Sequence, residues 1–378
     1  MMKKDVDVLL MNPPFGTVMN PYISIPVLAA YLKSRGIHTK AYDANQEFLY
    51  RFVTLENIRK GKEFVKNRFC ELNTREELSF SEIFEYAFLF NIVKEMEIDQ
   101  QKLSKLYLPF SDFSDLQESK VKNLAIRLAS VPNFPEMFIT QPHFIYSSPF
   151  DVFSSEDIIQ STNTDSIYNE ILGEIIAEVM SAYNPTVVGL SLTYNNQVLP
   201  AFYCAHMIKR INPATHVTLG GTFITIHMRS LKNETLFKCV DSFVLDEGEI
   251  PLENLFRELA KKNGKLENVP GLVYPVNGSI RYNPSAPPVS LEQLPPPDYS
   301  VFDLDRYLLP RQDLMVPFRL SKGCYWRKCA FCRTDLSFCR NFEQPPFEFV
   351  YQQLKHVILT FGLKNFVFSD ESANPVLL

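Results

Sequence analysis

Short apolar runs that alternate with helical patterns constrain the fold of this chain most strongly. Runs typical of buried strands occur at residues 6–11, 38–42, 187–192, 216–219 and 240–245. Apolar residues with helical spacing follow most of these runs, at residues 25–32, 198–211, 223–231 and 250–262. Strands that alternate with helices predict a parallel sheet covered by helices on both faces. We therefore expect an α/β protein with a doubly wound parallel sheet of the Rossmann or flavodoxin type.

Residues at the carboxyl ends of these strands are candidate ligand-binding residues, because such sheets bind ligands beyond that edge. The candidates are mostly small or polar, and they are Asn12, Pro13, Asp43, Ser191, Thr193, Gly220, Gly221, Glu247, Gly248 and Glu249. The acidic stretch 246–249 has a second interpretation, because acidic side chains also stabilise the N-terminus of the helix that follows.

Two segments interrupt the alternation and suggest how the chain is divided. Residues 44–180 are rich in Phe, Glu and Lys and predict a mostly helical insertion in the α/β domain of residues 1–43 and 181–283. A hairpin is expected at 271–282, turning at Asn277-Gly278. Residues 284–313 contain many prolines and predict an extended linker. A second unit, residues 314–378, then begins with a strand.

Four of the seven cysteines cluster in this second unit. Cys324, Cys329 and Cys332 have C-x4-C-x2-C spacing, and three thiolates on one loop can hold three irons of a cubane cluster while the fourth iron stays open. Cys339 would complete a four-thiolate set for structural zinc or for a fully ligated cluster. The remaining interpretation, small buried apolar residues, suits Cys70, Cys204 and Cys239 better than the clustered thiols.

Residues 321–332 resemble the cluster loop of radical S-adenosylmethionine (radical SAM) enzymes. The commonest form of that motif has three residues between the first two cysteines, whereas this chain has four, as some branches of the superfamily do. The resemblance implies a [4Fe-4S] cluster on the three clustered cysteines, with SAM bound at the open iron. It also implies that Phe331 packs near the SAM adenine and that Asp370 or Glu371 meets the SAM amino group. The following strand and helix would begin a partial β/α barrel.

Upstream, residues 6–43 and 187–249 are similar to the cobalamin-binding domain that precedes the radical SAM core in one large class. The motifs Asn12-Pro13-Pro14, Gly220-Gly221 and Glu247-Gly248-Glu249 follow one another in the order found there. The resemblance implies that the strand-end candidates bind cobalamin. The D-x-H-x-x-G motif that supplies a lower histidine ligand in many cobalamin proteins is absent, and Asp246 stands where these relatives usually have Gly.

Taken together, these resemblances imply an enzyme that cleaves SAM reductively to a 5′-deoxyadenosyl radical, with cobalamin as the methyl carrier of a methyltransferase or as the cofactor of a cyclase. Its substrate is unknown, and its electrons would come from an external donor such as flavodoxin or ferredoxin. Two alternatives stay open. One is a non-catalytic module that holds a corrinoid or related tetrapyrrole beside a vestigial cluster loop. The other is an interaction protein stabilised by zinc, with Cys339 as fourth ligand.

The second unit is short for a barrel, because eight β/α units need about 250 residues. We therefore expect a truncated radical SAM core, or one that a separate chain completes. The net charge of −5, from 38 basic and 43 acidic residues, argues against nucleic acid as a partner. No apolar window approaches the roughly 18 residues of a membrane helix, and no signal peptide is visible, so the sequence predicts a cytoplasmic protein without a membrane partner.

Overall fold

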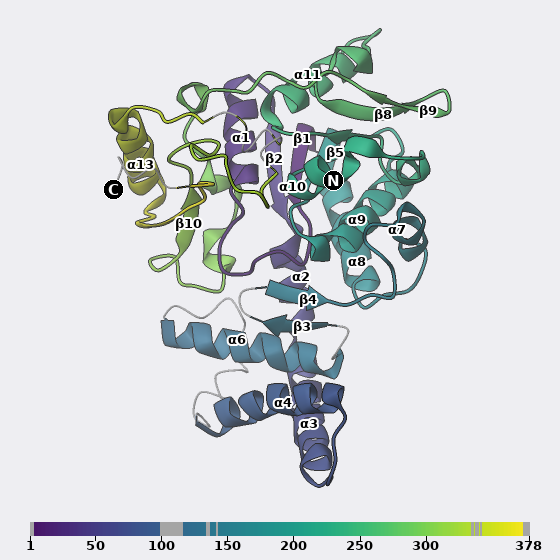
Figure 1. Ribbon diagram of the computed structural model, residues 1–378, viewed down its shortest axis with the longest axis vertical. Helices are drawn as coiled ribbons and strands as arrows, with labels where there is room; N and C mark the ends of the chain where they lie inside the picture. Colours follow the sequence, from purple (N-terminus) through teal and green to yellow (C-terminus); the bar gives the residue numbers. More distant parts are fainter. Residues whose placement is uncertain are drawn as a thin grey trace.

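The computed structural model describes residues 4–98, 116–133, 137–140, 143–333, 336, 340 and 342–372. Within them, one large sheet has the strand order β2-β1-β5-β6-β7-β8-β9 (Figure 1). The strands are β1 (Lys4–Asn12), β2 (Thr39–Asp43), β5 (Tyr183–Ser191), β6 (His216–Gly220), β7 (Ser242–Val244), β8 (Leu272–Val276) and β9 (Ser279–Tyr282). The first five are parallel, and the hairpin β8–β9 extends the sheet in antiparallel fashion.

Helices cover both faces of this sheet because the apolar strands face two ways. In β1, Leu9 and Met11 point into one core and Val8 and Leu10 into the other, as the two-residue period of a strand requires. The first core is covered by α8 (Asn169–Ala182), α9 (Val198–Ile211) and the short α10 (Thr222–His227). The second is covered by α1 (Ser24–Ser34) and α11 (Glu249–Leu259). The predicted doubly wound α/β fold is therefore confirmed.

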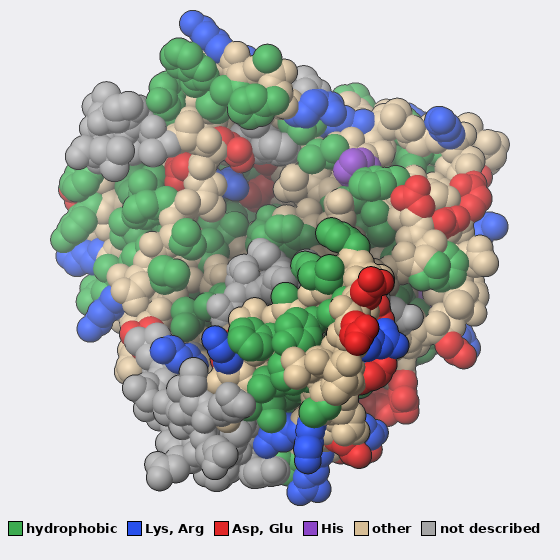
Figure 2. Space-filling model, turned by 60° about the horizontal axis from the view of Figure 1, so that its bottom comes forward, with side chains coloured by type: hydrophobic (Ala, Val, Ile, Leu, Met, Phe, Trp, Pro, Cys, Tyr) green, Lys and Arg blue, Asp and Glu red, His purple; other side chains and the backbone are tan. Residues whose placement is uncertain are grey.

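The segment between β2 and β5 is mostly helical, and its middle part extends away from the sheet at the bottom of Figure 1, whereas its last helices pack beside α9. Its elements are α2 (Ala44–Phe52), α3 (Leu55–Asn73), α4 (Phe80–Ile98), α6 (Leu116–Ser130), the antiparallel pair β3 (Met137–Thr140) and β4 (His143–Tyr146), and α7 (Ser155–Ser161). Helices α3 and α6 lie in contact at Gly61, where an added Cβ would lie 1.7 Å from the carbonyl oxygen of Leu128. Figure 2 brings this end forward and shows apolar side chains gathered on it; Phe80 of α4 is 88% exposed.

The last part of the chain is a βαβ unit that packs beside α1. Strands β10 (Met315–Phe318) and β11 (Asn365–Phe368) are parallel, and α13 (Phe347–Phe361) connects them and ends at Gly362 in the left-handed conformation. Pro317 is tolerated in β10 because this strand lies at the edge of a two-stranded sheet. Val316 and Val350 belong to the same apolar core as Ile25 of α1. The division into separate domains stays a prediction, since this core is continuous.

Three short 3₁₀ helices, Leu291–Gln293, Tyr299–Val301 and Leu304–Arg306, lie in the proline-rich segment that connects the sheet to this unit. Among the described residues, no helix is both long enough and apolar enough to cross a membrane.

Candidate functional site

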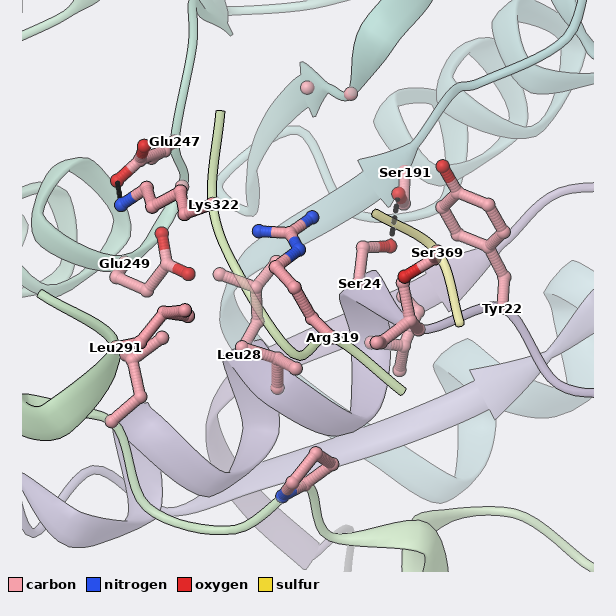
Figure 3. A pocket seen from close by; sticks show the side chains of 18 of the residues that line it. Tyr22, Ser24, Leu28, Ser191, Glu247, Glu249, Leu291, Arg319, Lys322 and Ser369 are labelled. Carbon is pink, nitrogen blue, oxygen red and sulfur yellow. Dashed lines mark hydrogen bonds and ion pairs between the residues drawn. The ribbon is translucent and has the colours of Figure 1, made fainter. Parts of the chain in front are cut away.

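A cavity of about 230 Å³ lies where the carboxyl ends of the parallel strands face the βαβ unit (Figure 3). One wall comes from the ends of β5, β6 and β7 and from the start of α1. The opposite wall comes from the linker, from the end of β10 and from the first residues of the cysteine loop, 318–323. The two parts of the chain with recognisable motifs therefore share one cavity.

Part of the cavity wall consists of apolar side chains and glycines. Leu10, Leu28, Val244 and Leu252 line it together with three glycines, Gly189, Gly220 and Gly248. A Cβ at Gly248 would lie 3.1 Å from Leu28 Cδ2, and one at Gly189 would lie 3.3 Å from Leu10 Cδ2. Side chains at Gly248 and Gly189 would crowd Leu28 and Leu10, so these two glycines allow the wall to pack closely.

Gly221 serves the backbone rather than the cavity volume. Its φ of +105° lies in a region that only glycine adopts readily. A Cβ there would lie 2.4 Å from the carbonyl oxygen of Leu192, so the bare backbone allows β6 to turn into α10 directly against the end of β5.

Charged side chains gather on one side of the cavity. Lys322, which is buried, donates to Glu247 Oε2 at 2.7 Å and to the carbonyl of Val289 at 2.6 Å. Glu249 is also buried, and its Oε2 has no hydrogen-bond partner in the described structure, nor has Glu247 Oε1. Burial raises the pKa of Glu249 above its ordinary value, and the neighbouring charge of Glu247 raises it further. Glu247 and Glu249, separated by one residue, thus differ in their surroundings: only Glu247 is paired with Lys322.

The other side of the cavity carries hydroxyl groups and a second cation. Ser24 Oγ and Ser191 Oγ are 2.7 Å apart, and no side chain caps the N-terminus of α1, which opens here. The guanidinium of Arg319 extends between this pair and Glu249 in Figure 3 and forms no hydrogen bond or ion pair within the described part of the chain. Glu371 also lines the cavity; partial burial raises its pKa, and the Arg319 charge opposes that rise. This side can therefore accept negative charge on a ligand.

The cysteine loop begins directly at the cavity. Asp370 anchors its start by accepting hydrogen bonds from the backbone N–H of Leu320 and from Ser321 Oγ. Ser372 Oγ, 3.3 Å from Cys324 Sγ, and the backbone N–H of Arg327 lower the pKa of Cys324. These hydrogen bonds favour the thiolate, which is the form that binds metal.

All three loop cysteines are free thiols that are not fully buried. The described residues nevertheless contain no group of three His, Cys, Asp or Glu side chains arranged to hold a metal ion. The three thiols still have the donor chemistry for an iron–sulfur cluster.

Comparisons with known proteins find similar chains among both sequences and solved structures. No family model matches. A protein of Pyrococcus horikoshii described as "Uncharacterized methyltransferase PH0819" is 27% identical over 212 residues, which is 55% of this chain and 44% of that protein. The radical SAM methyltransferase TsrM of Kitasatospora setae, solved with cobalamin and a [4Fe-4S] cluster bound, has a TM-score of 0.48 at 12% identity. The TsrM structure with tryptophan substrate and a SAM analog bound has a TM-score of 0.47, also at 12% identity.

These matches differ in how much they cover. The two TsrM structures cover 98% and 96% of this chain, but only 48% and 47% of TsrM itself. The chain thus spans less than half the length of each of these similar proteins.

Seven of the predicted site residues line the cavity. They are Ser191, Gly220, Gly221, Glu247, Gly248, Glu249 and Glu371. Asp246, in the same loop, has a φ of +66° and an ion pair with Arg229. A glycine would adopt that conformation without strain, which gives a physical reason for Gly at this position.

Four predicted residues near the strand ends do not line the cavity and lie in a neighbouring hydrogen-bond network. Asp43 accepts from Asn12 at 3.1 Å and from the hydroxyl of Tyr307 at 2.6 Å. Gln197 donates to the carbonyl of Pro13 and accepts from the N–H of Thr193. The network fixes the loop after β1, so these residues shape the site from outside it.

Two residues expected beside SAM have other surroundings. Phe331 is 91% exposed, and Asp370 is occupied by the hydrogen bonds that anchor the loop. Cys339, the fourth ligand of the zinc interpretation, lies outside the described residues. Burial raises the pKa of Cys204 to about 12 and that of Cys239 to about 11, as expected of inert core thiols.

Sequence reasoning missed Ser24, Arg319 and Lys322 as cavity residues. Ser24 is a residue type that often caps helices, which gives it an ordinary structural interpretation, although Ile23 occupies the N-cap position. Lys322 had a usable signal, since it lies two residues before Cys324, whereas Arg319 follows an ordinary strand pattern and had none.

Proposed function

We propose that this chain forms the cobalamin-binding and cluster-binding part of a cobalamin-dependent radical SAM methyltransferase. The observation that carries this proposal is the shared cavity: the strand ends of the doubly wound sheet and the start of the cysteine loop line the same space. The protein from Pyrococcus horikoshii described as an uncharacterized methyltransferase, 27% identical over 212 residues, supports methyl transfer rather than cyclisation.

The cavity residues suit a corrinoid in two respects. The apolar wall beside Gly189, Gly220 and Gly248 suits the face of a flat macrocycle, and the unpartnered oxygens of Glu247 and Glu249 suit the amide groups at the rim of a corrin ring. No histidine lines the cavity within the described residues, so the protein offers no imidazole ligand from there. When bound, cobalamin supplies a transferable methyl group.

The cluster would be held by Cys324, Cys329 and Cys332. When bound, a [4Fe-4S] cluster with an open iron supplies the electron that cleaves SAM. The chain itself stabilises the Cys324 thiolate through Ser372 and through the backbone of Arg327. An external one-electron donor is part of this proposal.

Anaerobic reconstitution tests both cofactors separately. With iron and sulfide, we expect about four irons per chain. Changing Cys324, Cys329 or Cys332 to Ala should remove them, whereas Cys70→Ala, a matched change of an exposed cysteine outside the loop, should not. Loss of iron in Cys339→Ala, or zinc in the purified protein with no capacity for iron, would support the four-thiolate alternative instead.

For cobalamin, we expect stoichiometric binding of hydroxocobalamin that is lost in Gly189→Val, because the added side chain crowds the cavity wall at Leu10 and Leu252. Gly278→Ala is the control, since nothing lies within 4 Å of a Cβ there. Its positive φ of +79° strains an alanine there, but this strain stays in an exposed turn that does not line the cavity. A chain that binds the cluster but no corrinoid would contradict the cobalamin half of the proposal.

A further inference from the structure

The ion pair between Lys322 and Glu247 connects the two halves of the candidate site. Lys322 is only 7% exposed and lies two residues before Cys324. Its ammonium group is 2.7 Å from Glu247 Oε2 and 2.6 Å from the carbonyl oxygen of Val289. A buried charge loses its hydration, so this ammonium depends on both partners. The side chain that precedes the cysteine loop is thereby fixed to the sheet domain.

The backbone of Lys322 is fixed as well. Its N–H and carbonyl form two 2.8 Å hydrogen bonds with the backbone of Glu343, beyond the far end of the loop. The carboxylate of Glu343 in turn accepts from Ser290 Oγ and from the N–H of Leu291. Both ends of the cysteine loop are therefore held by one cross-linked set of contacts, while the cysteines between them are not fully buried.

Glu247 faces the cavity on its other side. Its Oε2 holds Lys322 and accepts from the N–H of Val289 at 3.2 Å, whereas its Oε1 is buried without a partner and the residue lines the cavity. Figure 3 shows Glu247, Lys322 and Glu249 side by side at this wall. A ligand that bonds to Oε1 acts on the same carboxylate that positions the cysteine loop.

We propose that the Lys322–Glu247 pair is a coupling element, through which a corrinoid in the cavity and a cluster on the cysteine loop each increase the affinity for the other. This inference rests on the proposed function. Lys322 and Glu247 act here as positioning residues: a ligand that bonds to Glu247 Oε1 acts on the carboxylate that holds Lys322, two positions before Cys324. Binding coupling is reciprocal, so the effect has the same size measured from either side.

The test measures the affinity for hydroxocobalamin by optical titration, under anaerobic conditions, on the chain with and without a reconstituted cluster. For the natural chain we expect about tenfold tighter binding when the cluster is present, within the usual range of such couplings. Lys322→Gln should reduce this ratio to near one, and the ratio is read independently of any change in the affinity for either cofactor alone. Lys322→Arg keeps the charge and should retain part of the coupling.

A matched control is available at Lys209. Its ammonium donates to Asp241 at 2.9 Å and to the backbone carbonyls of Pro213 and Thr215, but it lies away from the cavity. Lys209→Gln removes the same kind of contact and should leave the coupling ratio unchanged. Where Lys322→Gln fails to fold, Glu247→Gln removes the charge at nearly constant shape and takes its place.

The outcomes separate the two ideas. If the natural chain binds neither cofactor, the proposed function fails. If both bind but the ratio is near one in the natural chain, or survives in Lys322→Gln and Glu247→Gln, the coupling inference is overturned. Loss of the ratio in Lys209→Gln to the same degree would overturn it too, because a general loss of rigidity would then explain the effect.

Discussion

Replacing Gly221 by alanine should destabilise the fold far more than the same change at its neighbour Gly220. At Gly221 the backbone has φ +105° and ψ −179°, and holding a residue other than glycine there costs about 1–3 kcal/mol. The new Cβ would also lie 2.4 Å from the carbonyl oxygen and 2.9 Å from the carbonyl carbon of Leu192. Both atoms belong to the backbone, so relieving the clash must move the end of β5.

Overpacking of this kind typically costs another 1–3 kcal/mol. The movement would also strain two hydrogen bonds, from Leu192 N–H to the carbonyl of Gly220 at 2.7 Å and from Phe223 N–H to the carbonyl of Leu192 at 3.2 Å. We therefore expect Gly221→Ala to lower the free energy of unfolding by about 2–6 kcal/mol. In Gly220→Ala the Cβ would lie 3.6 Å from Val244 Cβ, an ordinary contact, and the change should stay within about 0.5 kcal/mol.

Urea unfolding of the cofactor-free protein, followed by far-ultraviolet circular dichroism, measures both variants against the natural chain. The expected result is a clearly lower midpoint for Gly221→Ala and an unchanged midpoint for Gly220→Ala. Equal midpoints for the two variants, or a larger loss at Gly220, would refute the argument from backbone conformation.

Three further predictions address other parts of the molecule. Gly61→Ala should lower the free energy of unfolding by more than about 2 kcal/mol, because its Cβ would push α6 away from α3, even though alanine favours helices. Lys66→Ala, on the exposed face of α3, is the control. Equal urea midpoints for the two variants would contradict the prediction. Burial lowers the pKa of His216 from 6.5 to about 4. Between these pH values the unfolded chain binds more protons than the folded chain, so the free energy of unfolding should fall as the pH drops from 6.5 towards 4. His216→Gln should flatten this part of the plot of unfolding free energy against pH. Burial raises the pKa of Glu249. The folded chain therefore keeps this proton after the unfolded chain has lost it, and the free energy of unfolding should fall as the pH rises above 4.5. A Glu249→Gln variant with the same pH dependence would show that Glu249 is not the group responsible.

The sheet could be predicted because its strands are continuous apolar runs bounded by turn residues. The runs at 6–11 and 216–219 lie inside β1 and β6, and the run at 187–192 ends one residue beyond β5. Their alternation with helices predicted parallel pairing. The attachment of β8–β9 to β7 was not predictable, because a hairpin pattern specifies its own turn and not the strand against which it pairs. The hairpin β3–β4 was hidden in a segment with no clear period.

The site was predictable only where it depends on chain topology. Ser191, Gly220 and Glu249 follow parallel strands, and the sheet itself brings them to one edge. Asp43 follows a strand in the same way, yet Tyr307 from the distant linker occupies its carboxylate. The partners of Lys322 lie 75 and 33 residues away along the chain, and no local pattern encodes such contacts.

The pairing of β1 with β5 has a consequence for how the chain is made. Leu10 pairs with Gly189, and all of residues 44–182 must be synthesised before that partner exists. At about 5–20 residues per second, the nascent chain carries β1 with one unpaired apolar edge for roughly 7–30 s. During that interval the helices between β2 and β5 can fold from local contacts, and their compact form shortens the loop that must close. The insertion thus favours assembly of the central strands late in translation, after its own helices have formed.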